Sequence, residues 1–133
     1  MKRLQLGLIG SGRAGLIHGA NIARRIEQAE LAAVCDANPD NLRAAAAELG
    51  CLQTVADYRA VCADPAIDAV VIVTPTFLHA EIACAAAAAG KHVFLEKPMA
   101  VTADECRAIE EACEAAGVKL QIGSQLGLLD PPG

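Results

Sequence analysis

Two kinds of segment alternate along the chain. Short apolar runs rich in β-branched residues are typical of strands, and longer alanine-rich stretches with capping residues are typical of helices. The run Ala69–Val73 is apolar throughout, as expected of a central parallel strand that is buried on both faces. The predicted strands are 4–9, 31–35, 52–55, 69–73, 91–95 and 118–122, and the predicted helices are 13–26, 39–49, 57–63, 77–89 and 102–116.

Strand and helix follow each other in regular order, without a hairpin signal. Because parallel strands are joined by right-handed crossovers, this order predicts an α/β fold of the Rossmann type. We expect a doubly wound, mainly parallel, six-stranded sheet with helices on both faces. Residues 1–123 are predicted to form this dinucleotide-binding domain. Residues 124–133 are interpreted as a tail or as a truncated crossover to a further domain, since the pattern dissolves there.

A glycine-rich turn follows the first predicted strand. Gly10, Gly12 and Gly15 form a G-x-G-x-x-G pattern between a strand and a helix. The carboxylate of Asp36 follows at the end of the second strand, and the combination is typical of dinucleotide binding. Gly10 allows a tight turn, Gly12 lets the backbone approach a pyrophosphate, and Gly15 lets the helix lie close to the sheet. We expect further phosphate donors at the helix N-terminus from Ser11, Arg13 and Ala14.

Asp36 is predicted to accept hydrogen bonds from the hydroxyls of the adenosine ribose. Its charge would repel a 2′-phosphate, and Ala37 rather than an arginine follows it, so the sequence favours NAD over NADP. Arg43 on the next predicted helix is the residue that could reverse this preference. The alternatives are a glycine turn without a ligand and an Asp36 that only caps a loop or helix.

Two further loops follow predicted strands at the same edge of the sheet. In the first, Thr74 and Pro75 border the expected path of the nicotinamide side of the dinucleotide. His79 either forms a hydrogen bond near the bound cofactor or merely occupies the first turn of a helix. His18, on the first predicted helix, is interpreted as a packing or surface residue.

The second loop contains Glu96, Lys97 and Pro98. A charged pair at the end of a buried strand is costly unless it is used or paired. The ammonium of Lys97 could orient a substrate hydroxyl or carbonyl beside the nicotinamide and stabilise negative charge that develops there. Pro98 favours a cis peptide bond that aims Lys97. The alternative is a surface salt bridge at the strand exit.

Composition excludes several other classes of protein. A chain of 133 residues, 54% hydrophobic and 20% charged, fits one globular domain. The net charge of −5, the scattered basic residues and the few aromatic ones argue against nucleic-acid binding. No apolar run approaches the roughly 20 residues that span a bilayer, and the first residues run straight into a strand rather than a signal peptide. We therefore expect a cytoplasmic protein without a membrane partner.

Six cysteines are distributed over the chain without a C-x-x-C motif or zinc-finger spacing. We interpret them as small buried side chains in a reducing compartment, with a metal or redox role as the alternative. No metal site is predicted.

These motifs together resemble the Gfo/Idh/MocA family of oxidoreductases, named after glucose-fructose oxidoreductase, inositol dehydrogenase and a rhizopine-catabolism protein. The resemblance covers about residues 3–123. It implies NAD(P)-dependent oxidation or reduction of a sugar, cyclitol or related polyol, with Lys97 as a catalytic or substrate-orienting residue. The matching segments are 10–15 with His18, 34–39, 64–76 with His79, and 89–98.

The family also has a second domain, which carries most substrate contacts, an aspartate and a histidine near the reacting carbon, and most of the oligomer interface. The sequence contains no counterpart of it, and residues 124–129 replace the usual aromatic and basic crossover. We therefore expect this chain alone to bind NAD and to catalyse poorly or not at all. The alternative is a free-standing dinucleotide-binding module, or a subunit that another chain completes. The substrate and the homo-oligomeric state stay open.

Overall fold

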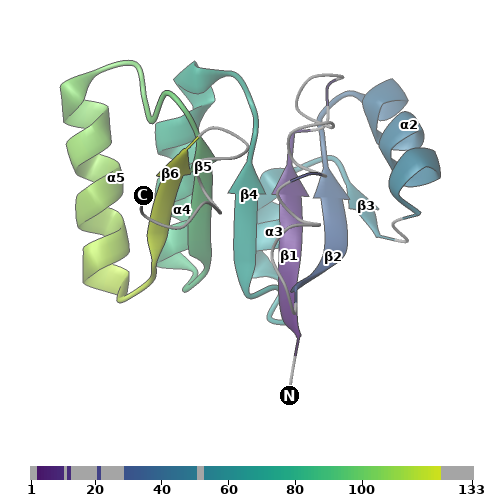
Figure 1. Cartoon of the computed structure of the whole chain (residues 1–133), viewed down its shortest axis with the longest axis horizontal. Helices are drawn as coiled ribbons and strands as arrows, with labels where there is room; N and C mark the ends of the chain where they lie inside the picture. The colour runs from purple at the N-terminus through teal and green to yellow at the C-terminus, as the bar shows by residue number, and fades with distance from the viewer. Residues whose placement is uncertain (1–2, 11, 13–20, 22–28, 51–52, 124–133) are drawn as a thin grey trace.

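A single parallel sheet of six strands forms the centre of the molecule (Figure 1). The computed structural model describes residues 3–10, 12, 21, 29–50 and 53–123. The strand order β3-β2-β1-β4-β5-β6 confirms the predicted Rossmann-type α/β fold. The strands are β1 (Leu4–Ile9), β2 (Ala29–Cys35), β3 (Thr54–Val55), β4 (Ala69–Ile72), β5 (His92–Glu96) and β6 (Leu120–Gly123).

The helices in the described residues are α2 (Pro39–Leu49), α3 (Tyr58–Ala63), the short 3₁₀ helix η1 (Thr76–Leu78), α4 (His79–Ala88) and α5 (Ala103–Ala116). The predicted helix over 13–26 lies outside the described residues, apart from the helical Asn21. The segment predicted as one helix over 77–89 begins as η1 and continues as α4. Strand β2 begins two residues earlier than the sequence predicts, and β5 and β6 end one residue later.

The starts of α2 and α5 follow directly from their capping residues. The side chain of Asn38 accepts hydrogen bonds from the backbone N–H groups of Asp40 and Asn41, which have no partner inside the helix. Thr102 and Glu105 form a reciprocal capping box at the start of α5. Both helix starts therefore lie where the sequence predicts them.

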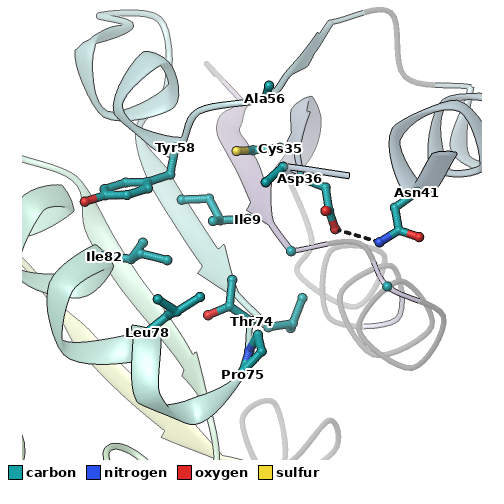
Figure 2. A pocket seen from close by; sticks show the side chains of 14 residues that line it. Ile9, Cys35, Asp36, Asn41, Ala56, Tyr58, Thr74, Pro75, Leu78 and Ile82 are labelled. Carbon is teal, nitrogen blue, oxygen red and sulfur yellow. Dashed lines mark hydrogen bonds between the residues drawn. The ribbon is translucent and has the colours of Figure 1, made fainter. Parts of the chain in front are cut away.

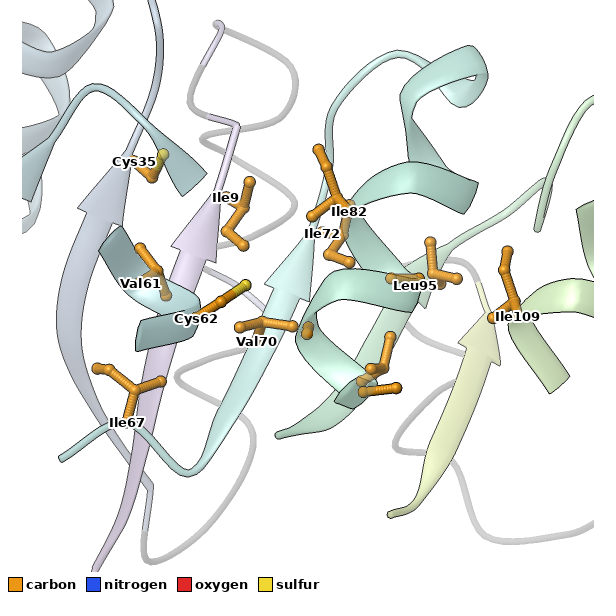
Figure 3. Close-up of a cluster of buried hydrophobic side chains, with 14 of the residues drawn as sticks. Ile9, Cys35, Val61, Cys62, Ile67, Val70, Ile72, Ile82, Leu95 and Ile109 are labelled. Carbon is orange, nitrogen blue, oxygen red and sulfur yellow. The ribbon is translucent and has the colours of Figure 1, made fainter. Parts of the chain in front are cut away.

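Helices cover both faces of the sheet, as predicted. On β4, Val70 and Ile72 belong to one apolar cluster, which α3, α4 and α5 cover (Figure 3). Ala69 and Val71 belong to the second cluster, which Ala45 of α2 joins from the opposite face. Successive residues of a strand point to opposite faces, so all four residues of β4 are buried, as in a central strand. No described helix is long and apolar enough to cross a membrane.

Lys91 is almost completely buried, although lysine is normally exposed. Its ammonium donates to the carbonyl oxygens of Asp64 and Ile67, at 2.6 and 2.7 Å. We expect Lys91→Met to lower the free energy of unfolding by about 2–3 kcal/mol, because two carbonyls lose a charged donor. Urea unfolding measures this. Lys119→Met, at an exposed position, is the control, and equal stability of the two variants would contradict the prediction.

Candidate nucleotide-binding site

Backbone hydrogen bonds join the carboxyl ends of the central strands at one edge of the sheet. The N–H of Gly10 donates to the carbonyl of Cys35 at 2.8 Å. The N–H of Val73, just after β4, donates to the carbonyl of Ile9 at 2.9 Å. These bonds hold the end of β1, from Ile9 to Gly10, between the ends of β2 and β4. In a doubly wound sheet, ligands bind at this edge.

A cavity of about 570 Å³ opens at this edge, within the size range of small-ligand sites (Figure 2). Five residues predicted from the sequence to bind the cofactor line it: Gly10, Gly12, Asp36, Thr74 and Pro75. The other described residues that line the cavity are Ile9, Cys35, Ala37, Asn41, Ala56, Tyr58, Val73, Leu78 and Ile82.

The carboxylate of Asp36 is fixed by two donors from the start of the next helix. Oδ1 accepts from the backbone N–H of Asn38 at 2.8 Å, and Oδ2 accepts from Nδ2 of Asn41 at 3.3 Å, which Figure 2 shows as a dashed line. Asp36 is only partly buried and lines the cavity. A carboxylate held in this way is oriented before a ligand binds, which lowers the entropy cost of accepting further hydrogen bonds.

The wall opposite Asp36 is mostly apolar. Leu78 and Ile82 come from η1 and α4, and Tyr58 comes from α3 (Figure 2). The hydroxyl of Tyr58 donates to Oε2 of Glu81 at 2.7 Å, and this hydrogen bond raises the pKa of the phenol. The site thus offers an apolar wall beside a carboxylate, a combination that suits an aromatic base attached to a ribose.

Cys35 lies in the floor of the cavity. Burial, followed by the neighbouring Asp36 carboxylate, raises the pKa of its thiol to about 12. The side chain is therefore a neutral thiol at physiological pH, and it acts as a small apolar surface. The described cysteines are all unpaired, and no cluster of three metal-ligating side chains occurs in the described part of the chain.

Two features of the cavity fit a bound nucleotide. Gly10 has φ +97°, and a Cβ there would lie 2.9 Å from the backbone nitrogen of Thr74, so only glycine leaves this space open. The Thr74 hydroxyl is buried and has no hydrogen-bond partner within the described structure. A buried polar atom without a partner costs free energy unless a ligand or water satisfies it.

Three of the candidate residues do not line the cavity. His79 is buried behind its wall, as the first residue of α4. Glu96 ends β5, and Lys97 follows it, exposed and without an ion pair to another described residue. The Lys97–Pro98 peptide bond is cis. His18 and the turn residues Ser11, Arg13, Ala14 and Gly15 lie outside the described residues.

Sequence reasoning missed two polar residues of the cavity. Asn41 could have been suspected from its place in the first turn of α2, close in sequence to Asp36. Tyr58 carried no such signal, since the side of α3 that faces the cavity depends on the tertiary fold. Arg43, which could have favoured NADP, pairs with Asp40 on the exposed surface of α2 and does not line the cavity.

The glycine turn, the carboxylate at the end of β2 and the strand order together define a Rossmann nucleotide-binding domain. Comparison with known proteins then identifies its kind. Residues 4–124 match the family described as "Oxidoreductase family, NAD-binding Rossmann fold". The chain belongs to this Gfo/Idh/MocA family and is an NAD-binding Rossmann domain.

Similar proteins include several inositol dehydrogenases. The scyllo-inositol 2-dehydrogenase (NAD(+)) of Bacillus subtilis is 36% identical over 121 residues, which are 91% of this chain and 35% of that protein. The myo-inositol 2-dehydrogenase of Thermotoga maritima is 40% identical over 113 residues, covering 84% and 34% of the two chains. The crystal structure of scyllo-inositol dehydrogenase from Lactobacillus casei with bound NAD(H) and scyllo-inositol superimposes with a TM-score of 0.82 at 34% identity, covering 91% and 36%. The chain thus spans about a third of these relatives.

Proposed function

We propose that this chain is the cofactor domain of a dehydrogenase that transfers a hydride between a nicotinamide and a hydroxyl-bearing carbon of a cyclitol, sugar or related polyol. The single observation that carries the proposal is the oriented Asp36 carboxylate beside the Gly10 turn, at the mouth of an apolar cavity. Family membership supports the reaction class. The relatives named as inositol dehydrogenases support the substrate class.

The dinucleotide would bind along the carboxyl edge of the sheet. Asp36 would accept from the hydroxyls of the adenosine ribose, and the apolar wall around Tyr58 would contact the adenine. The pyrophosphate would pass over Gly10 and Gly12, with Ser11, Arg13, Ala14 and Gly15 as the further contacts that the sequence motif suggests. The nicotinamide half of the dinucleotide would run past Thr74 and Pro75 toward the loop that follows β5.

NAD is proposed over NADP because the charge at Asp36 opposes a 2′-phosphate. The bound nicotinamide supplies a carbon that accepts or returns a hydride. Lys97, with Glu96 beside it, would orient the substrate oxygen and stabilise its developing negative charge during the transfer. The hydroxyl proton goes to a base, which the family resemblance places in the second domain.

Asp36→Ala tests the proposed cofactor site. We expect NADH to bind roughly 5- to 150-fold more weakly, because the ribose hydroxyls lose a charged hydrogen-bond acceptor. This loss reduces the free energy of binding by about 1–3 kcal/mol. Isothermal titration of the 133-residue chain with NADH measures the affinity. Asp104→Ala, which removes the same charge from an exposed position on α5, is the control and should leave the affinity unchanged. Unchanged affinity in Asp36→Ala would remove Asp36 from the ribose site.

The alternative function is a non-catalytic dinucleotide-binding module, and a turnover assay tests whether these residues can catalyse the reaction by themselves. The chain is incubated with NAD and a panel of cyclitols and sugars, and NADH formation is followed. Binding without turnover agrees with a cofactor domain that needs a second domain and with a module. Turnover by these residues alone would contradict the proposal that the catalytic groups are divided between two domains.

A further inference from the structure

His79 holds two loops with one buried ring. The side chain is 2% exposed, so water contributes almost nothing to its hydrogen bonding. Nε2 lies 3.0 Å from the carbonyl oxygen of Thr74. Nδ1 lies 3.1 Å from the carbonyl oxygen of Pro98 and 3.2 Å from that of Met99. Carbonyl oxygens only accept, and a neutral imidazole carries a single N–H, so the ring donates through one nitrogen to one of the two loops and packs against the other loop.

The two loops follow neighbouring strands and carry different parts of the site. Thr74 follows β4 and lines the cavity. Pro98 and Met99 follow β5 and come directly after Lys97, which does not line the cavity. The ladder between β4 and β5 ends at Ile72 and Leu95, while on the other side of β5 the N–H of Lys97 donates to the carbonyl of Gly123 at 3.3 Å. The chain that follows Lys97 therefore depends on other contacts for its conformation. The ring of His79 is such a contact, and it reaches both loops.

Burial makes this contact strong and specific. At a buried position, bulk solvent does not compensate a carbonyl that loses its donor, and a loop that leaves the ring also loses buried contacts, so departure of either loop costs free energy. Residues Leu78 and Ile82 flank His79 on η1 and α4 and form the cavity wall. A ligand that presses on this wall, or on Thr74, therefore acts on the residue that holds the Lys97 loop.

We propose that His79 is a positioning residue that couples occupancy of the nucleotide cavity to the placement of Lys97. This inference rests on the function proposed above. His79 touches neither the cavity nor the reacting atoms, and it acts by fixing the Thr74 loop and the Pro98–Met99 segment against the same ring. His79, which follows Thr74 and Pro75 in the sequence, thereby receives a role that differs from direct cofactor contact.

Amide hydrogen exchange, read by mass spectrometry on the full 133-residue chain, tests the coupling. His79→Leu removes the ring and its hydrogen bonding, and His79→Gln, which lacks the ring but keeps an amide, serves if the leucine variant does not fold. Without ligand, we expect exchange in residues 96–101 to rise at least about tenfold in the variant, while β1 and β2 stay protected. Unchanged exchange at 96–101 would overturn the proposal.

A matched control comes from the second described histidine. His92 also makes a hydrogen bond to the backbone, accepting through Nδ1 from the N–H of Lys119 at 3.0 Å. It is the first residue of β5, so it lies at the end of the strand opposite Lys97. His92→Gln should leave exchange at 96–101 unchanged. An equal rise in His92→Gln would mean that general loosening of β5 explains the effect, and it would overturn the proposal.

ADP separates positioning from a merely structural role. ADP carries adenosine and pyrophosphate but no nicotinamide, so it fills the cavity without reaching Lys97. We expect ADP to slow exchange at 96–101 in the unaltered chain and to lose this effect in His79→Leu, or in His79→Gln where that variant replaces it, while it still slows exchange at 73–78. The same slowing at 96–101 in the variant would overturn the proposal. Failure of ADP and NADH to bind the unaltered chain would instead contradict the proposed function, and the ligand-free comparison would still decide whether His79 holds the two loops.

Discussion

Gly10→Ala is expected to abolish NADH binding and to lower the free energy of unfolding by about 3–4 kcal/mol. Two costs combine at this residue. Its φ of +97° is a conformation that L side chains rarely adopt, and a Cβ would lie 2.9 Å from the backbone nitrogen of Thr74. That neighbour cannot turn away like a side chain, because β4 and β1 are joined at this point by the bond from Val73 to Ile9. Urea unfolding and NADH titration measure the two effects.

Gly50→Ala is the matched control for the backbone cost alone. Gly50 ends α2 with φ +66°, and nothing lies within 4 Å of a Cβ built there. The control should lose only about 1 kcal/mol and should bind NADH normally. If Gly10→Ala were no less stable than Gly50→Ala and still bound NADH, the close approach at Thr74 would not matter for the site.

Lys97→Ala is expected to lower kcat by about 10²- to 10⁴-fold in a polypeptide that joins this chain to a second domain of the family. Its affinity for NADH should change little, because Lys97 lies outside the cavity and is exposed. Loss of kcat at unchanged cofactor affinity indicates a group that acts on the substrate during the reaction. Steady-state kinetics with a cyclitol substrate, together with NADH titration, measure both quantities.

Lys119→Ala is the control for this second prediction, since it removes another exposed lysine, which precedes the start of β6. Turnover in the control should be normal. Normal turnover in Lys97→Ala would leave Lys97 as a surface residue at a strand exit, which is the alternative that its sequence position allows.

The sequence predicted the parts of the fold that depend on neighbouring residues. The uninterrupted apolar run at 69–73 indicated a buried central strand, and Asn38 and Thr102 indicated two helix starts. These signals are local. A capping residue accepts hydrogen bonds from N–H groups of its own helix, and successive side chains of one strand point to opposite faces of the sheet. The motif at Gly10 and Asp36 could be recognised from residue types and spacing alone, and the structure brings both residues to one cavity.

What the sequence did not reveal depends on contacts between distant segments. The role of His79 was left open, because its partners at 98 and 99 come within reach only when β5 lies beside β4 and both loops are formed. The burial of Lys91 had no signal, since its two carbonyl partners belong to the loop between α3 and β4. Tyr58 likewise enters the site through the orientation of a short helix.

The aromatic content of the chain gives that tyrosine a practical importance. The protein contains one tyrosine and no tryptophan, so its intrinsic ultraviolet emission comes almost entirely from a single phenol. The phenol of Tyr58 lines the cavity, and its hydroxyl donates a hydrogen bond to Glu81. A reduced nicotinamide nucleotide absorbs where tyrosine emits, so its binding in this cavity would quench the tyrosine emission. The domain therefore carries a natural optical reporter at its own binding site.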